Sequence, residues 1–182
     1  MTEFRRAALA FGGNMGEVAD AFCYALGRLA SAGQTKVLSR SSVYRTAPWG
    51  RTDQPDFLNM AALIETSLPA TDLLALCLTI EKERGRTRGE RWGPRTLDID
   101  IIAYGDEESA EAALTLPHPR GTVRAFVLIP LEEIAPDLRL GAKTIREWAA
   151  SCGGSGVRRD EAATKILNAS SIPSAAGLTL PP

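Results

Sequence analysis

Residues 97–102, with the sequence LDIDII, restrict what this chain can fold into more than any other segment. Successive side chains of a β-strand point to opposite faces, so Asp98 and Asp100 share one face and Leu97, Ile99 and Ile101 share the other. One face of this strand is therefore expected in a hydrophobic core, and the other holds two neighbouring carboxylates. Such carboxylates repel each other, and a divalent cation such as Mg²⁺ relieves the repulsion.

The segment that precedes this strand, residues 85–95, is rich in glycine and arginine and contains Trp92. Its composition favours a loop. Guanidinium groups bind phosphate oxygens in pairs, so several arginines beside a cation site indicate a bound nucleotide with its Mg²⁺. A solvated edge strand beside a charged surface loop would have the same pattern, and the residues alone leave that alternative open. The arginines in and next to this segment are Arg84, Arg86, Arg88, Arg91 and Arg95.

The composition of the chain limits its class and its partners. Its 182 residues are 45% hydrophobic and 24% charged, which is typical of one globular domain with some additional chain. A formal net charge of −1 argues against a dedicated nucleic-acid binder. No stretch approaches the roughly 20 apolar residues of a membrane helix. Three separated cysteines and a single histidine favour free thiols over disulfides or a zinc site, so we expect a cytoplasmic protein.

Hydrophobic spacing along the chain predicts the order of its helices and strands. Apolar residues recur at helical intervals in 17–32 and 70–84, and strand-like runs lie at 7–11, 36–46, 57–66 and in the aspartate segment. The order strand, helix, strand, strand, helix, strand is that of the α+β ferredoxin-like fold. This split βαβ arrangement is an antiparallel sheet with both helices on one face. The other face would then be free to bind a ligand.

The chain after the aspartate strand is expected to form C-terminal additions to that fold. A short helix at 124–134 should be interrupted at Pro130, because proline lacks the backbone N–H, and a second helix should cover 144–150. From Ser151 onward the composition shifts to serine, glycine, alanine and proline. We therefore expect a folded domain over residues 1–150 and a weakly ordered C-terminal tail over residues 151–182.

Four separated blocks resemble the 6-hydroxymethyl-7,8-dihydropterin pyrophosphokinase family, also called 2-amino-4-hydroxy-6-hydroxymethyldihydropteridine diphosphokinase. The blocks are 42–48 (SVYRTAP), 53–59 (DQPDFLN), 91–102 (RWGPRTLDIDII) and 114–120 (LTLPHPR). The similarity runs from about Leu9 to Leu138. It implies an enzyme of folate biosynthesis that transfers pyrophosphate from ATP to the hydroxymethyl group of the pterin and releases AMP. It also implies two Mg²⁺ ions and two small-molecule substrates, and we expect a monomer without nucleic-acid or membrane partners.

The resemblance also implies which residues handle the phosphates. Asp98 and Asp100 match the family's magnesium ligands. Arg86 and Arg95 match the arginines that hold the transferring phosphates, so these four residues are the expected catalytic set. Further positions that match nucleotide-binding residues of the family are Arg88, Arg91, Thr115, His118 and Arg124. On sequence alone, His118 could equally be a solvated histidine in a turn.

A second group of positions matches the family's pterin site. Phe57 and Phe126 match the two aromatic residues that sandwich the pterin ring, although either could instead be a core phenylalanine. Asn59 lies two residues beyond Phe57, on the same face of its strand, and its amide can both donate and accept. The remaining substrate positions are Thr46, Trp49 and Trp92. Glu81 is either close to the site or an exposed glutamate at a helix end.

Other readings remain to be separated by experiment. An Asp-x-Asp pair with Mg²⁺ also serves nucleotidyltransferases and other phosphoryl transferases, and a ferredoxin-like sheet can be a binding module for RNA or small ligands. The chain also departs from the family pattern in three places. The loop between Arg88 and Trp92 is one residue shorter than usual, Pro119 stands where an aromatic residue is common, and Ala113 stands where an arginine is common.

Overall fold

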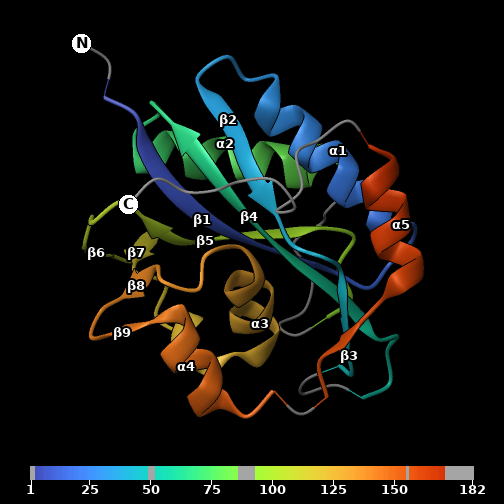
Figure 1. The fold of residues 1–182 in the computed structure, drawn as a ribbon. Coiled ribbons are helices and arrows are strands. Elements are labelled where there is room, and N and C mark those ends of the chain that lie inside the picture. Colours follow the sequence, from blue (N-terminus) through green and yellow to red (C-terminus); the bar gives the residue numbers. More distant parts are fainter. Residues whose placement is uncertain (1–2, 49–51, 86–92, 155, 171–182) are drawn as a thin grey trace.

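A twisted antiparallel sheet forms the centre of the molecule (Figure 1). The computed structural model describes residues 3–48, 52–85, 93–154 and 156–170. Within this part of the chain the sheet has the strand order β10-β3-β4-β1-β5, and β2 also pairs with β4. Its strands are β1 (Arg5–Gly13), β2 (Thr35–Arg40), β3 (Tyr44–Thr46), β4 (Phe57–Thr66), β5 (Asp98–Tyr104) and β10 (Arg158–Arg159). The expected α+β ferredoxin-like class is confirmed.

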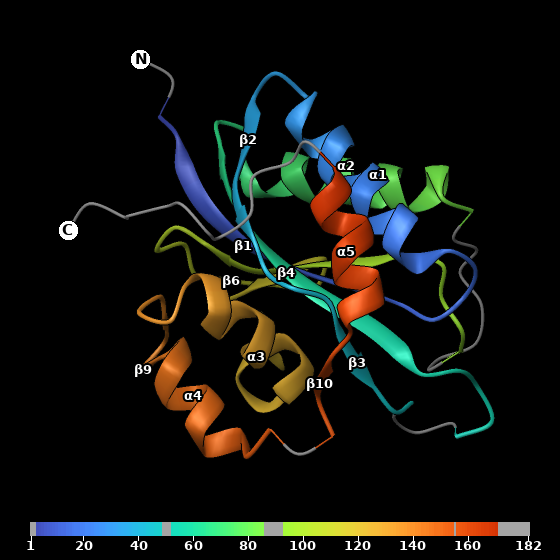
Figure 2. The same cartoon turned by 45° about the vertical axis from the view of Figure 1, so that its right-hand side comes forward.

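Helices cover both faces of this sheet. The first face carries α1, α2 and α5, and the second face carries α3 and α4 (Figure 2). The helices are α1 (Val18–Ala30), α2 (Ala70–Glu83), the 3-10 helix η1 (Gly121–Val123), α3 (Ala125–Ile134), α4 (Ile145–Cys152) and α5 (Glu161–Ala169). Two hairpins complete the described chain, β6 (Ser109–Glu111) with β7 (Leu114–Leu116) and β8 (Arg139–Leu140) with β9 (Lys143–Thr144). Each described helix is too short or too polar to cross a membrane.

The first face is packed with large apolar side chains. Phe22 of α1 is fully buried and meets Phe11 of β1 edge to face, with ring centroids 6.1 Å apart. Leu26 and Leu29 continue the stripe at helical spacing and are also fully buried. The helix expected at 17–32 is therefore confirmed, with its apolar stripe on the sheet as the spacing predicted.

The second face is built from smaller residues. Ala8 and Ala10 of β1 and Ala61 of β4 are buried there, and they leave room for Leu128 and Leu131 of α3 to pack close to the sheet. The expectation that this face is free was thus wrong for the half covered by α3 and α4. The other half, beside the ends of β3 and β5, stays open and forms a cavity.

Two local expectations were wrong for identifiable reasons. The run 36–46 is not one strand. Arg40 pairs with Ala62 of β4 and Tyr44 pairs with Asn59 of β4, so four residues of the run lie opposite only three residues of β4. The pairing with β4 is interrupted between these two pairs, which separates β2 from β3. In addition, α3 continues through Pro130. Proline removes only one helical hydrogen bond, and the helix buries most of its length against the sheet and α4.

The C-terminal region also differs from expectation. Within the proposed tail the structure has β10 and α5, and Leu167 of α5 is fully buried against α1 and the sheet. Composition pointed to weak order because small and polar residues dominate the segment as a whole. The few apolar side chains that anchor it are spaced as one stripe of a short helix. Residues 171–182 lie outside the described part, and the division of the chain at residue 150 stays a prediction.

Candidate active site

A cavity of about 930 Å³ lies on the open half of the second face, between the sheet and α3. This is the size of a site for ligands such as nucleotides and their co-substrates. The sheet contributes residues from four strands, and η1, α3 and the C-terminal segment close the other side. The lining residues include Ala10, Gly12, Thr46, Phe57, Asn59, Arg95, Asp98, Asp100, Arg120, Val123, Arg124, Phe126, Gly156 and Val157.

The carboxylates of β5 lie on the cavity side of the sheet. Asp98 and Asp100 line the cavity, whereas Ile99 and Ile101 are buried in the core on the opposite face. The alternation predicted for this strand is therefore confirmed. On the neighbouring strand the residues paired with the two aspartates are Gly12 and Ala10. Because these positions carry no side chain or only a methyl group, the space beside the carboxylates stays open for a ligand.

Basic groups surround the carboxylate pair. Arg95 donates to Asp98. The Asp100 carboxylate has His118 Nε2 and Arg124 Nη1 each 3.9 Å away. Neighbouring protein partly removes Asp100 from water, which raises the pKa of its carboxyl, and the charge of Asp98 raises it further. The ionised pair is thus costly to hold, and a cation in the cavity would stabilise it.

His118 is oriented by a backbone contact. The backbone N–H of Arg120 donates to His118 Nδ1 at 3.1 Å. A neutral imidazole with an accepting Nδ1 carries its proton on Nε2, the atom that faces Asp100. Burial lowers the pKa of His118, and the Asp100 carboxylate acts in the opposite direction. In either protonation state Nε2 therefore presents a hydrogen-bond donor toward the site.

The other end of the cavity has flat and amide-bearing side chains. Phe57 and Asn59 of β4 line it from the sheet, and Phe126 of α3 lines it from the helix side. Asn59 Nδ2 donates to Thr46 Oγ1 at 3.0 Å, which uses one of the four hydrogen-bonding positions of this amide. Thr46 also lines the cavity. The structure thus brings together the four described residues that resemble the family's pterin site.

Two predicted positions lie elsewhere. Thr115 of β7 does not line the cavity, and its hydroxyl donates to the backbone oxygen of Glu111. Glu81 is buried, not exposed, and its carboxylate accepts a hydrogen bond from the backbone N–H of Ile99 at 2.7 Å. It therefore supports the aspartate strand from the first face. The predicted residues Trp49, Arg86, Arg88, Arg91 and Trp92 lie outside the described part of the chain.

Sequence reasoning missed Asn14, which joins the segment of the cavity-lining Arg95 to the segment before β4. Its Oδ1 accepts from the backbone N–H of Arg95 at 2.9 Å, and its Nδ2 donates to Gln54 Oε1 and to the Pro55 carbonyl. The segment before β4 is thereby tied to the segment before β5. A usable signal existed, because a polar residue directly after a buried strand lies at the same end of the sheet as the start of its antiparallel neighbour.

Comparisons with known proteins show what this chain is similar to. A family model described as 7,8-dihydro-6-hydroxymethylpterin-pyrophosphokinase matches residues 8–136. The 2-amino-4-hydroxy-6-hydroxymethyldihydropteridine pyrophosphokinase of Methylorubrum extorquens is 47% identical over 156 residues, covering 86% of this chain and 99% of the relative. The protein of the same description from Synechocystis is 46% identical over 131 residues, covering 72% of this chain and 67% of the relative.

Solved structures support the fold. A crystal structure of the HPPK-DHPS protein of Plasmodium falciparum superimposes with a TM-score of 0.67 at 14% sequence identity, over 83% of this chain. This chain spans only 44% of that protein's chain. At such low identity the likeness concerns the arrangement of strands and helices alone.

The fold and the matched sequence first define a class, that of diphosphate-transferring kinases built on a ferredoxin-like sheet. The chain belongs to the 7,8-dihydro-6-hydroxymethylpterin-pyrophosphokinase family. It is therefore an ATP-dependent pterin diphosphokinase of folate biosynthesis, as the four sequence blocks predicted. The family match ends at residue 136, so the chain from 137 onward, with α4, β10 and α5, lies beyond it.

Proposed function

We propose that pyrophosphate passes from ATP to the hydroxymethyl group of 6-hydroxymethyl-7,8-dihydropterin inside the cavity between the sheet and α3. One observation carries this placement. The carboxylate pair of β5 and the aromatic and amide group of Phe57, Asn59 and Phe126 line the same cavity. The phosphates of ATP would lie over β5, and the pterin ring would lie at the end formed by β3 and β4.

Asp98 and Asp100 are the residues that would hold Mg²⁺. The described residues offer no group of three or more His, Cys, Asp or Glu side chains suited to a metal. Two carboxylates nevertheless fit Mg²⁺, which is commonly bound by one or two carboxylates together with substrate phosphates and water. The support for a cation here is that both carboxylates line one cavity and that burial and the charge of Asp98 raise the pKa of Asp100. When bound there, Mg²⁺ would supply charge neutralisation at the phosphates, and the family resemblance implies two ions.

The basic groups beside the carboxylates act on the polyphosphate. Phosphoryl transfer needs positioning and charge stabilisation more than covalent chemistry from the protein. Arg95 and Arg124 line the cavity, and His118 Nε2 lies 3.9 Å from the carboxylate of the cavity-lining Asp100. These three groups would hold the transferring phosphates in line with the pterin hydroxyl. The roles of Arg86, Arg88 and Arg91 on the phosphates, and of Thr115 on the nucleotide, stay predictions.

The end of the cavity formed by β3 and β4 would bind the pterin through ring stacking and hydrogen bonds. The rings of Phe57 and Phe126 would stack on the flat heterocycle from the sheet side and the helix side. Asn59, whose amide is oriented by Thr46, would form hydrogen bonds with the polar edge of the pterin. Trp49 and Trp92 remain predicted contacts of the same substrate.

An assay of AMP release tests this proposal. Purified protein is incubated with ATP and Mg²⁺, with and without the pterin, and nucleotides and pterin products are separated. We expect AMP and diphosphorylated pterin in equal amounts, and only when the pterin is present. Release of pyrophosphate would instead indicate a nucleotidyltransferase, and binding without turnover would indicate a binding module. A chelator should abolish the reaction, and added Mg²⁺ should restore it.

The cellular setting is also part of the proposal. We propose a cytoplasmic monomer that has no nucleic-acid partner. The support is that Cys23, Cys77 and Cys152 are all free thiols, as expected in a reducing compartment, and that the net charge of −1 does not favour a phosphate backbone. Sedimentation analysis of the purified chain checks the oligomeric state.

A further inference from the structure

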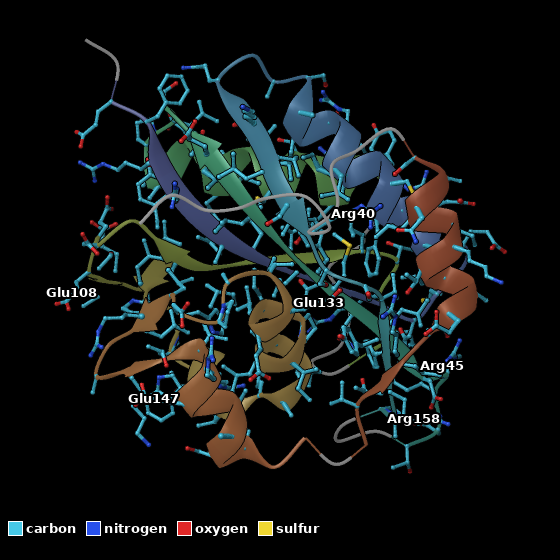
Figure 3. The ribbon with its side chains drawn as sticks, viewed as in Figure 1. Arg40, Arg45, Glu108, Glu133, Glu147 and Arg158 are labelled. Carbon is cyan, nitrogen blue, oxygen red and sulfur yellow. The ribbon has the colours of Figure 1, made fainter. Side chains whose placement is uncertain are left out.

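The C-terminal segment 156–170 starts at the cavity, pairs with the β3 edge of the sheet and ends in α5 on the first face (Figure 2). It lies beyond the residues that the family model matches. Its strand β10 pairs with β3, with Arg158 opposite Arg45 and Arg159 opposite Tyr44. Figure 3 shows the labelled Arg45 and Arg158 at this edge of the molecule. Gly156 and Val157, directly before β10, line the cavity.

Asp160 links β3 to α5 through both its backbone and its side chain. Its carboxylate accepts two hydrogen bonds from Arg45, from Nε at 2.9 Å and from Nη2 at 2.6 Å. The other carboxylate oxygen accepts from the backbone N–H of Ala163 and caps the first turn of α5. Its own N–H donates to the Val43 carbonyl at 2.8 Å, just before β3. These bonds lower the pKa of the Asp160 carboxyl, chiefly through the Ala163 N–H.

The far end of the segment is fixed to the core. Leu167 is fully buried, and the buried Arg40 of β2 donates through Nη2 to the Leu167 carbonyl and to Asn168 Oδ1. Thr164 Oγ1 accepts from the Val43 N–H at 3.0 Å. Since α5 is anchored in this way, Asp160 is a firm attachment point and not the tip of a free end.

Strand β3 needs such an attachment. It is three residues long and has β4 on its other side, so without β10 it would be a short edge strand. Its last residue is Thr46, whose hydroxyl accepts from Asn59 Nδ2 at 3.0 Å. A shift of β3 therefore moves Thr46 and turns the Asn59 amide, while β5 and its carboxylates are separated from β3 by β4 and β1.

We propose that the segment 156–170 positions the pterin end of the active site. Asp160 acts as a positioning residue that holds β3, and through it Thr46 and Asn59, and Val157 adds a wall to the pocket. The inference rests on the placement of the pterin given under Proposed function. It predicts that substitutions in the segment weaken pterin binding and leave the affinity for the nucleotide unchanged.

The decisive variant is Asp160→Asn. Asparagine has the same shape and can still cap α5, but it lacks the charge that pairs with Arg45. We expect the pterin dissociation constant, measured by calorimetry in the presence of a non-hydrolysable ATP analogue and Mg²⁺, to rise about three- to tenfold, as for the loss of one charged hydrogen bond. Affinity for the analogue and kcat at saturating pterin should stay within about twofold of wild type.

Glu161→Gln is the matched control. It makes the same change of charge at the next residue, and its carboxylate pairs at 3.2 Å with the exposed Arg159. This variant should bind both ligands as wild type does. Val157→Ala provides a second, independent test, because it trims a wall residue without touching Asp160. It should raise the pterin dissociation constant by about two- to fivefold at an unchanged melting temperature.

The possible results distinguish failure of this inference from failure of the proposed function. Wild-type pterin affinity in both Asp160→Asn and Val157→Ala would overturn the inference, and so would an equal loss of pterin and nucleotide affinity. If Asp160→Asn does not fold, Val157→Ala decides alone. Failure of the wild-type protein to bind the pterin at all would overturn the proposed function itself, because the inference concerns only differences between variants.

Discussion

The two faces of the central sheet use the same strands in opposite ways. On β1, Leu9 and Phe11 point into the core under α1 and α2, whereas Ala10 and Gly12 face the cavity. On β5 the contrast is one of charge, with Ile99 and Ile101 in the core under the first-face helices and Asp98 and Asp100 on the cavity side. The first face is filled with large side chains, and the second is kept small or polar where a ligand must enter.

This difference separates stability from catalysis within single strands. A side chain on the first face contributes buried apolar area and close packing. A side chain on the open half of the second face is free of that constraint and can be chosen for its chemistry. Substitutions on the first face should therefore lower stability and spare turnover, and substitutions on the open half of the second face should lower activity or binding and spare stability.

The largest effect is expected at the carboxylate pair. Asp98→Asn and Asp100→Asn should each lower turnover about a thousandfold or more, because a neutral amide is a poor Mg²⁺ ligand. The melting temperature should change little or rise, since burial and the neighbouring charge of Asp98 both raise the pKa of Asp100 and make its ionised form costly to hold. AMP release and thermal unfolding are measured on the same samples. Near-normal turnover in either variant would contradict the metal assignment.

Ile101→Ala changes the next residue of the same strand, on the other face. Ile101 is buried in the core, so its truncation should lower the free energy of unfolding by about 2–5 kcal/mol. Urea unfolding measures that loss. Below the unfolding transition, kcat per folded molecule should remain close to the wild-type value. A large fall in kcat without a loss of stability would show that the two faces are not independent.

A smaller effect is expected from Phe57→Ala at the pterin end of the cavity. Removing one stacking partner should weaken pterin binding by about 1–3 kcal/mol and leave ATP affinity unchanged. Calorimetric titration of each ligand measures this. Phe57 is only partly buried, so the melting temperature should move little. If ATP affinity fell by the same factor, Phe57 would belong to the core and not to the ligand site.

The smallest effect should come from a position that belongs to neither face. Gly27 is an exposed glycine in the interior of α1, and a Cβ added there meets no atom within 4 Å. Gly27→Ala should therefore stabilise the protein by about 0.5–1 kcal/mol, because alanine has the higher helix propensity. Turnover should stay at the wild-type level. Destabilisation would contradict the open surroundings of Gly27.

The periodicity of the sequence by itself determined much of the fold and part of the site. The alternation around Asp98 and Asp100 determined which face of β5 is core, because side chains alternate along any strand. The stripe through Phe22 placed α1 on the sheet for the corresponding reason in a helix. The matching blocks placed Phe57 and Asn59 together on one strand, and the structure brings both to the cavity.

Other features of the fold and the site follow only from the tertiary structure, because they depend on contacts between segments that are distant in the chain. One extra residue between β2 and β3 changed the sheet, and the packing of α3 through Pro130 closed half of a face that sequence left open. Asn14 and Asp160 acquired their partners only when loops and strands far apart in the chain met. Short-range patterns record which side of an element is apolar. They do not record which other element will cover it, because that choice is made by the summed packing and hydrogen bonding of the whole chain.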